Sequence, residues 1–482
     1  MSQDNKKNMG RGLIYLTSSR MVFALSGFIL NIGLARLLGV EDYGIYGVIM
    51  ALMGIANIIY QPGIYTAVAK FTSENIEIAD PILTTGLKVE AGLTIVSTLA
   101  IFVCAPLIAQ LLNDSFLVPY IRLASLTTIP MGINLIYLGS LNGARRFGEQ
   151  AFSVIVHSAV KLLVIFVIIL LGFKVKGVIL GLILSVIIAT FVARHYCQYD
   201  NSTETFEMKR LLSFAVSVFI YVFCISLITN VDLLFVKSLL KSNEATGLYT
   251  AAANMSKVPF MLFSGFSTVL LPSVSQALSV NNTELFKKYV HQTLRYMLLG
   301  LFPLIFVLSS SAKEVITILY SENFSGAIIP FSILIVGISF SVILSVLSTV
   351  VIGSGSPRVA MTFAFILLPL DIALNLFLIP RYGLAGASSA TTLTFLVGSV
   401  MFGLYIYNRY KILMNFSSFL KILIASVTIY ILSVIYPCQG LWIILQYMFL
   451  FILYAFILLV LQEIRKEDIK IFRDILTPSR LY

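Results

Sequence analysis

Long apolar runs constrain this chain more than any other feature. Stretches of about twenty residues with few or no charges recur from near the first residues to about residue 461. A helix of that length spans the hydrocarbon core of a bilayer, and a helix satisfies its own backbone hydrogen bonds where lipid offers none. The runs lack the two-residue alternation of a transmembrane β-barrel. Together with a hydrophobic content of 59%, they predict an all-α polytopic membrane protein.

We expect about fourteen transmembrane helices, over residues 13–36, 44–69, 86–112, 117–140, 150–172, 176–196, 211–236, 246–275, 289–311, 326–353, 359–379, 384–407, 417–436 and 441–461. An even number places both ends of the chain on one side. If that side is the cytoplasm, its segments hold about three times as many Lys and Arg as the outer ones, as the positive-inside rule requires. The tail 462–482 has an amphipathic pattern and is expected to lie on the cytoplasmic membrane surface.

Several classes of function are disfavoured by what the sequence lacks. The net charge of +11 comes mostly from loops on one expected side, so we predict no nucleic-acid partner. The four cysteines and three histidines are scattered without metal-ligand spacing, which predicts no metal site and no cofactor. The chain has no phosphate-binding loop of the ATPase type and no recognisable catalytic constellation, so we expect no enzyme.

The chain repeats itself weakly in three places. Gly44-Ile45-Tyr46 is matched by Gly247-Leu248-Tyr249, and two further short strings after the expected fourth and fifth spans recur at nearly the same offset. Six spans in each repeat would give two halves of equal orientation, related by an axis along the membrane normal. We therefore predict an N-terminal six-helix lobe over 1–200, a C-terminal six-helix lobe over 201–410, and two extra helices with the tail over 411–482.

Three cations lie deep inside expected spans. Arg20, Lys161 and Lys257 each fall within a long apolar run, with His157 one helical turn before Lys161 and Pro259 two residues after Lys257, where a helix break is expected. A charge at bilayer depth costs about 2.5–3.5 kcal/mol on insertion scales, so such residues usually face a wet interior. They predict a cavity that binds an anion. The alternative is that each side chain snorkels to the surface or pairs with a buried carboxylate.

Two carboxylates also fall within expected spans. Asp232 lies near the outer end of the seventh, and Asp371 lies in the middle of the eleventh, one turn before Asn375. Either residue could carry a proton or coordinate Na⁺ and so couple transport to an ion gradient. The alternative is an ion pair, or for Asp232 an interfacial position.

At several short motifs the chain resembles a polysaccharide transporter of the MOP exporter superfamily, that is, an oligosaccharide-lipid flippase. The motifs are Ala35-Arg36-Leu37-Leu38-Gly39, Asp42-Tyr43-Gly44-Ile45-Tyr46, Asn230-Val231-Asp232, Gly247-Leu248-Tyr249 with Ala252-Ala253, and Asn142-Gly143 with Arg145-Arg146. The resemblance covers about 1–410. It implies two six-helix lobes around a central cavity, alternating access, and a polyprenyl-pyrophosphate-linked oligosaccharide as substrate.

The expected function is therefore a flippase for cell-surface polysaccharide biosynthesis in a bacterial cytoplasmic (inner) membrane. Its partners would be the lipid-linked oligosaccharide, membrane lipids, a coupling ion (H⁺ or Na⁺) and a glycan polymerase. Two alternatives remain open. A MATE-type drug antiporter predicts carboxylates rather than cations at the cavity centre, and a glycan polymerase or ligase usually carries one large outer loop.

Overall fold

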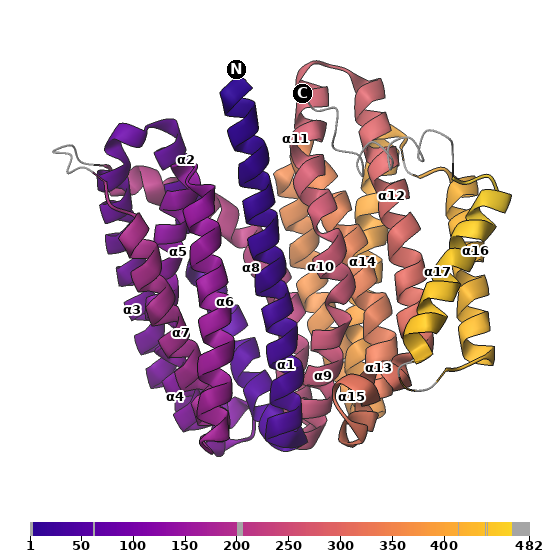
Figure 1. Cartoon of the computed structure of the whole chain (residues 1–482), viewed down its shortest axis with the longest axis horizontal. Coiled ribbons are helices and arrows are strands. Elements are labelled where there is room, and N and C mark those ends of the chain that lie inside the picture. The colour runs from indigo at the N-terminus through magenta and orange to yellow at the C-terminus, as the bar shows by residue number, and fades with distance from the viewer. Residues whose placement is uncertain are drawn as a thin grey trace. The chain divides into compact units, whose positions relative to one another are not determined.

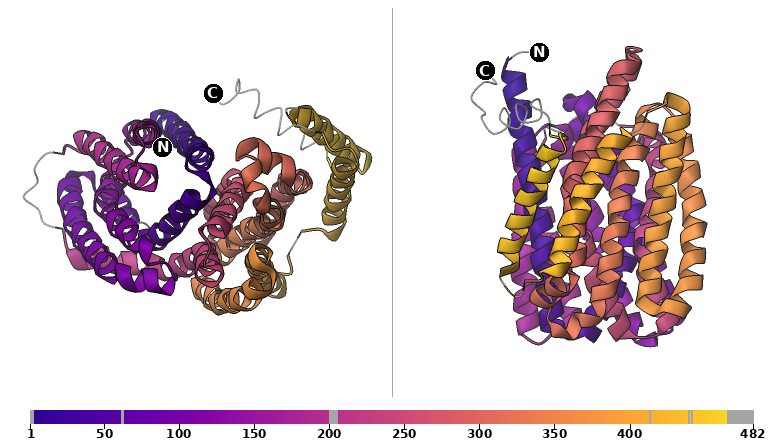
Figure 2. Two further views of the ribbon diagram at one scale, coloured as in Figure 1. Left: turned by 90° about the horizontal axis from the view of Figure 1, so that it is seen from below. Right: turned by 90° about the vertical axis from the view of Figure 1, so that its right-hand side faces the viewer.

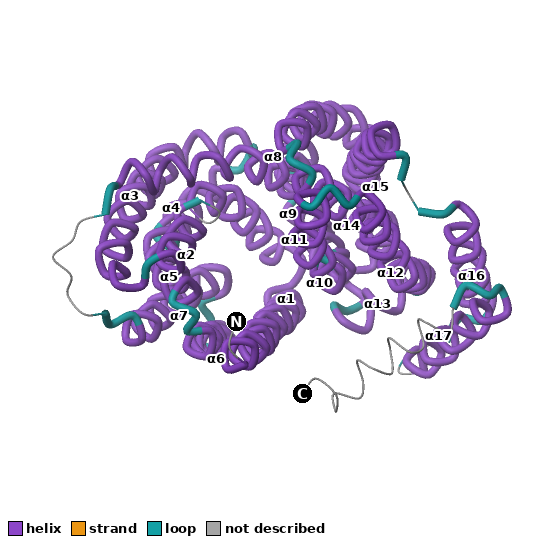
Figure 3. The backbone as a smooth tube through the Cα atoms, turned by 90° about the horizontal axis from the view of Figure 1, so that it is seen from above, coloured by secondary structure: helices purple, strands orange, loops and turns teal. Residues whose placement is uncertain are grey.

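The computed structural model describes residues 3–60, 63–199, 206–412, 414–438, 440 and 442–464. Within those ranges the chain is helical with short connections and contains no strand (Figure 3). The expected amphipathic tail lies mostly outside them, so its structure stays a prediction. The all-α fold class predicted from the apolar runs is confirmed.

The element bounds are as follows: α1 Gln3–Tyr60, α2 Ile64–Glu74, η1 Ile76–Ile78, α3 Ala79–Leu111, η2 Ser115–Leu117, α4 Val118–Ser125, α5 Thr128–Gly143, α6 Phe147–Leu170, α7 Lys174–Tyr196, α8 Met208–Leu240, α9 Asn243–Ser256, α10 Val258–Phe263, α11 Gly265–Ser279, α12 Thr283–Ser310, α13 Ala312–Leu319, η3 Glu322–Ala327, α14 Ile328–Gly353, α15 Pro357–Tyr410, α16 Phe416–Ile435 and α17 Trp442–Val460 (Figure 1). Side-chain amides of Asn282 and Asn415 accept backbone N–H bonds at the starts of α12 and α16, as N-cap residues do.

Twelve helical segments in the described ranges are long and apolar enough to cross a membrane. Two of them, α1 and α15, contain two expected spans each. In each case the two spans are joined across a kink at a glycine with non-helical φ and ψ, Gly39 in α1 and Gly383 in α15. Both glycines have positive φ, a conformation that other residues adopt only with strain. The expected span 44–69 is itself divided between the second half of α1 and the shorter helix α2. The expected span 117–140 is divided between α4 and α5, and 246–275 among α9, α10 and α11, whereas each remaining expected span coincides with one helix.

By their contacts the helices fall into two compact units. The first unit comprises 1–254 and 364–391, and the second comprises 255–363 and 392–482. The boundaries of the lobes predicted from the sequence repeat, which differ from these, stay a prediction. Each unit is described here by itself.

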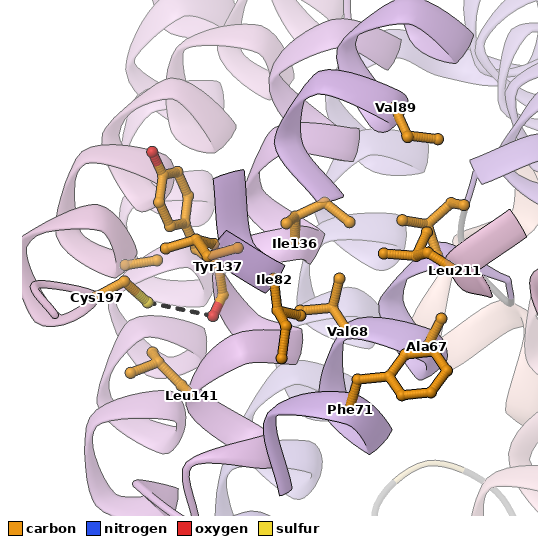
Figure 4. Close-up of a cluster of buried hydrophobic side chains, with 13 residues drawn as sticks. Ala67, Val68, Phe71, Ile82, Val89, Ile136, Tyr137, Leu141, Cys197 and Leu211 are labelled. Carbon is orange, nitrogen blue, oxygen red and sulfur yellow. Dashed lines mark hydrogen bonds between the residues drawn. The ribbon is translucent and has the colours of Figure 1, made fainter. Parts of the chain in front are cut away.

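In the first unit the helices α1, α6 and α7 pack side by side (Figure 1), while α2, α3, α5 and α7 enclose an apolar cluster (Figure 4). Ile82, Val68 and Ile136 are fully buried there. Cys197 lies at the edge of the cluster, where its thiol donates to the carbonyl oxygen of Tyr137 at 3.4 Å. The cluster fixes the relative positions of α2, α3, α5 and α7, and both α1 and α6 pack against α7.

In the second unit α12 is the central element, packed against α11, α14 and α16. The pair α16 and α17 lies at one edge of this unit (Figure 2). Arg295 of α12 is buried, and its Nε donates to Oε1 of Glu463 at 2.7 Å, just after the end of α17. The position of Arg295 near the end of an expected span favours a side chain that snorkels to the surface. The buried pair with Glu463 contradicts this interpretation. Sequence alone could not pair two residues so far apart in the chain.

The sequence repeat is also visible in the backbone. Positive φ occurs at both members of three matched pairs, Gly39 with Lys241, Arg145 with Gly355, and Lys174 with Gly383. The matched glycines 44 and 247 also face each other in the first unit. A methyl group on Gly44 would lie 2.1 Å from the carbonyl oxygen of Asn243, and one on Gly247 would lie 2.0 Å from that of Val40. The second half of α1 and α9 therefore meet through a symmetric contact of equivalent residues.

Candidate functional site

The positions of the buried cations follow from how α1 and α6 pack in the first unit. The ring of Tyr15 lies beside Gly148, and the ring of Phe166 packs against Gly33. In both pairs the sequence separation is the same, so the two helices run parallel and in constant register. This register places Arg20 of α1 level with Ser153 of α6, about one turn before His157.

His157 and Lys161 lie on the face of α6 that meets α1. Both are at least nine-tenths buried. The ammonium of Lys161 lies 4.7 Å from the centre of the Phe23 ring, and the His157 ring centre lies 6.1 Å from the same ring. A desolvated cation over an aromatic face is stabilised by about 2 kcal/mol, which offsets part of the cost of burying it. Among the described residues, Nε2 of His157 has no hydrogen-bond partner.

Arg20 lies on α1 one turn before Phe23, and its side chain is exposed. It is close enough to Tyr65 of α2 to act electrostatically on the Tyr65 hydroxyl. That hydroxyl accepts a hydrogen bond from Nε2 of Gln150, two turns before His157 on α6. The structure therefore brings Arg20, His157 and Lys161 to one seam between α1 and α6, which we call the basic seam.

Lys257 lies in the second unit. It occupies the connection between α9, which ends at Ser256, and α10, which begins at Val258, and its side chain is exposed. The helix break expected near Pro259 is confirmed by this connection. The association of Lys257 with the basic seam remains a prediction.

The two predicted carboxylates meet around Tyr249 in the first unit. The Tyr249 hydroxyl donates to Oδ2 of Asp232 at 2.7 Å, and the Asp371 carboxylate is close enough to act on the same hydroxyl. Both aspartates are buried, and the interfacial position considered for Asp232 stays a prediction. Residues from α8, α9 and α15 thus form one cluster, which the sequence could not show because they are far apart in the chain.

Further oxygen atoms complete this carboxylate cluster. Oγ1 of Thr391 lies 3.3 Å from Oδ2 of Asp232 and 3.2 Å from the carbonyl oxygen of Ala387. Asn375 donates its amide to Oδ2 of Asp371 at 3.2 Å, which leaves Oδ1 of Asn375 buried with no hydrogen-bond partner in the described chain. Asp232, Tyr249 and Thr391 thus share oxygen contacts, with Asp371 near the same tyrosine, a composition that suits a proton or a small hard cation.

An apolar cavity of about 670 Å³ lies inside the second unit between α12, α14 and α16. Its lining is almost entirely aliphatic and aromatic, with Phe302, Phe340 and Phe419 among the larger side chains. Apolar cavities of this kind bind hydrocarbon more readily than water.

Several buried charged residues were missed by the sequence analysis, among them Glu90, Lys237 and Glu463. Glu90 lies a few residues inside the expected span 86–112, yet the sequence analysis counted only Asp232 and Asp371 as carboxylates within expected spans. The side chain is completely buried in α3. Four carboxylates are buried in the described ranges, those of Glu90, Asp232, Asp371 and Glu463, so they outnumber the three predicted cations. No group of three or more His, Cys, Asp or Glu side chains in the described ranges could hold a metal ion.

A bundle of apolar helices with buried charges of both signs defines a polytopic membrane protein of transporter architecture. A family model described as polysaccharide biosynthesis protein matches residues 33–329, and the chain belongs to that family. A probable low-salt glycan biosynthesis flippase of Haloferax volcanii is 23% identical over 392 residues, which cover 80% of each chain.

Two solved structures share the fold. Lipid II flippase MurJ in an inward closed conformation is 16% identical with a TM-score of 0.77, covering 92% of this chain and 97% of that one. An inward-facing multidrug resistance MATE transporter of the MOP superfamily is 15% identical with a TM-score of 0.69, covering 83% and 98%. These likenesses confirm the MOP-type fold that the short motifs predicted.

Proposed function

We propose that this protein is a flippase that moves a polyprenyl-pyrophosphate-linked oligosaccharide from the inner to the outer leaflet of a bacterial cytoplasmic membrane. It would work by alternating access, with both termini in the cytoplasm, beside a polymerase that uses the translocated glycan. Transport rather than catalysis is the function that this family membership and this fold support. The relative from Haloferax volcanii is itself described as a probable flippase.

The basic seam is the single observation that carries this proposal. Arg20, His157 and Lys161 concentrate basic groups at one place within membrane-spanning helices. A pyrophosphate carries several negative charges, which an arginine can bind through two parallel hydrogen bonds and a lysine as a point charge. Lys257 would bind the same substrate in another conformation of the transport cycle.

The apolar cavity of the second unit is the part of the structure that would hold the lipid half of the substrate. Its lining by Phe302, Phe340, Phe419 and aliphatic side chains is suited to an isoprenoid chain. Each CH₂ group moved from water to such an environment contributes about 0.8 kcal/mol. In a bilayer the gain is smaller, because the tail already lies in hydrocarbon, so the cavity would guide the tail rather than supply affinity.

The carboxylate cluster would couple transport to an ion gradient. Asp232 and Asp371 share Tyr249 as a neighbour and are surrounded by oxygen atoms. In a low-dielectric environment two neighbouring carboxylates bind a proton or cation strongly. Na⁺ or H⁺ entering this cluster would stabilise one conformation of the transporter relative to the other.

A MATE-type drug antiporter is the second candidate. The buried carboxylates Glu90, Asp232 and Asp371 favour it, because a cationic drug needs anionic partners. A drug-susceptibility assay separates the two functions, since only the antiporter would raise the tolerance of cells to cationic drugs.

The main test is transport of a labelled lipid-linked oligosaccharide in proteoliposomes, read by the access of a membrane-impermeant lectin. Lys161→Ala should lower the initial rate about tenfold or more, because a hydrogen bond to a charged group is worth about 1.5–3 kcal/mol. Lys161→Arg should recover part of the rate because it keeps the charge. Protein level in the membrane is measured in parallel.

Lys176→Ala is the matched control. This lysine also lies over an aromatic ring, 5.9 Å from the centre of Tyr120, but it is exposed near the start of α7. Its removal should leave the rate within about twofold of that of the wild type. Unchanged transport by Arg20→Ala, Lys161→Ala and Lys257→Ala would eliminate the proposed role of these cations.

A further inference from the structure

Glu90 is the most unusual buried group outside the basic seam and the carboxylate cluster. Its side chain is 0% exposed on α3, packed against α5 at Gly132. A methyl group at position 132 would lie 2.7 Å from Oε1 of Glu90. The glycine therefore lets the carboxyl group sit directly against the main chain of the neighbouring helix.

The surroundings offer this carboxyl group no hydrogen-bond donor. Neither Oε1 nor Oε2 has a partner among the described residues. The hydroxyl of Thr94, one turn further along α3, donates to the backbone oxygen of Glu90 at 2.8 Å rather than to its carboxyl group. Next along the seam, Thr98 and Thr128 bond to each other and to the carbonyl oxygen of Ser125. These threonine hydroxyls are thus satisfied by one another and by backbone oxygens, and none of them bonds to Glu90.

No charged group compensates Glu90 either. Among residues whose side chains the structure describes, the titratable and charged ones on α3 and on the elements packed against it are Asp80, Lys88, Cys104, Glu77, Tyr65, Lys70, Glu74, Tyr120, Arg122, Tyr137, Tyr15, Arg20, Arg36, Glu41, Asp42, Tyr43, Tyr46, Lys209, Cys224, Asp232 and Lys237. No hydrogen bond or ion pair joins any of them to the Glu90 carboxyl. Lys70 pairs with Glu74, Lys88 is exposed, and the guanidinium of Arg122 lies over Phe102.

An ionised carboxylate in these surroundings would be very costly, because a buried unpaired charge loses its hydration and gains nothing in return. Neutralisation requires a proton or a metal cation. A cation such as Na⁺ needs several oxygen ligands, whereas the described contacts at Gly132 are a methyl group of Thr94 and Glu90 itself. The proton is the ligand that fits.

We propose that Glu90 is a proton-binding site of the first unit, separate from the carboxylate cluster at Asp232 and Asp371. The carboxylate takes up one proton from water when the α3–α5 seam opens, becomes a neutral acid when the seam closes, and returns the proton to water at the next opening. This inference rests on the proposed transport cycle and adds that α3 and α5 move apart in one of its states. Proton uptake would then be linked to the conformation of this unit rather than to occupation of the carboxylate cluster.

The test is infrared difference spectroscopy of the full-length protein in lipid nanodiscs near neutral pH. The carbonyl absorption of a protonated carboxylic acid should be present in the wild type. In Glu90→Gln this absorption should be weaker by the contribution of one carboxylic acid group. Glutamine keeps the shape and neutrality of the protonated acid, so the variant should fold and show the same thermal stability as the wild type. Glu77→Gln, at an exposed glutamate in η1, is the matched control and should leave the absorption unchanged.

A second measurement links the group to turnover. Proteoliposomes containing a pH-sensitive dye should show proton movement accompanying transport in the wild type, and this movement should fall at least about twofold in Glu90→Gln. Identical carboxylic-acid absorption in wild type and Glu90→Gln would show that Glu90 is ionised and overturn the proposal. Because the infrared signal does not depend on substrate, failure of glycan transport alone would count against the proposed function and leave Glu90 to be judged by its spectrum.

Discussion

The buried ion pair of the second unit allows a quantitative test of how this bundle is held together. Arg295 and Glu463 are each less than 5% exposed, and Nε and Oε1 are 2.7 Å apart. The guanidinium also donates to the backbone oxygen of Glu463. Glu463→Gln removes the negative charge with little change of shape and leaves the arginine buried and uncompensated. Breaking a buried pair from one side costs about 3–5 kcal/mol.

The assay is reversible unfolding of the purified protein in mixed micelles, from which the free energy of unfolding is obtained for each variant. Glu463→Gln and Arg295→Met should each lower it by about 3–5 kcal/mol, whereas Arg295→Met with Glu463→Met should recover most of the loss, because no charge is then left unpaired. The exposed pair of Lys70 and Glu74, whose charged atoms are 3.8 Å apart, is the control and should contribute below about 1 kcal/mol. Additive losses in the double variant would refute the reasoning.

Two further predictions concern the first unit. Asp232→Asn, made with the native Lys161 in place, removes a charge from the carboxylate cluster. The change in transport rate caused by Na⁺ or pH should then be at least about tenfold smaller than in the wild type. An unchanged ion dependence would exclude this cluster as the coupling site. Burial raises the pKa of the Cys197 thiol to about 12. Because the thiolate forms only as the pH approaches that value, alkylation of Cys197 should be negligible at neutral pH in the folded protein and rapid after denaturation in mild alkali, as mass spectrometry would show. Ready labelling of the folded protein would contradict the burial of this residue.

The sequence was sufficient for the helices because their signal is local. Each apolar run is long enough to reveal its own span, and the repeated motifs around Gly44 and Gly247 were visible without coordinates. Pro62-Gly63 marks an interruption of one span in the sequence, but it does not show that α1 ends at Tyr60 and a separate short helix α2 begins at Ile64. Helix ends of this kind are decided by packing as much as by composition.

The candidate site was predictable residue by residue but not as an arrangement. Arg20, Lys161, Asp232 and Asp371 were recognisable because charge is rare in apolar segments. That Asp232 and Asp371 share Tyr249 depends on contacts among α8, α9 and α15. Glu90 was overlooked because it lies near the start of its expected span, although the same criterion would have found it.

The contact between Gly44 and Gly247 bears on the origin of the chain. Each glycine faces the carbonyl oxygen four residues before the other, at 2.1 and 2.0 Å from where a methyl group would stand. Such reciprocity is the mark of an isologous interface, in which the same patch on two identical subunits pairs with itself. A half-length ancestor with this glycine could have dimerised through it, and gene fusion would then have made the pairing permanent within a single polypeptide.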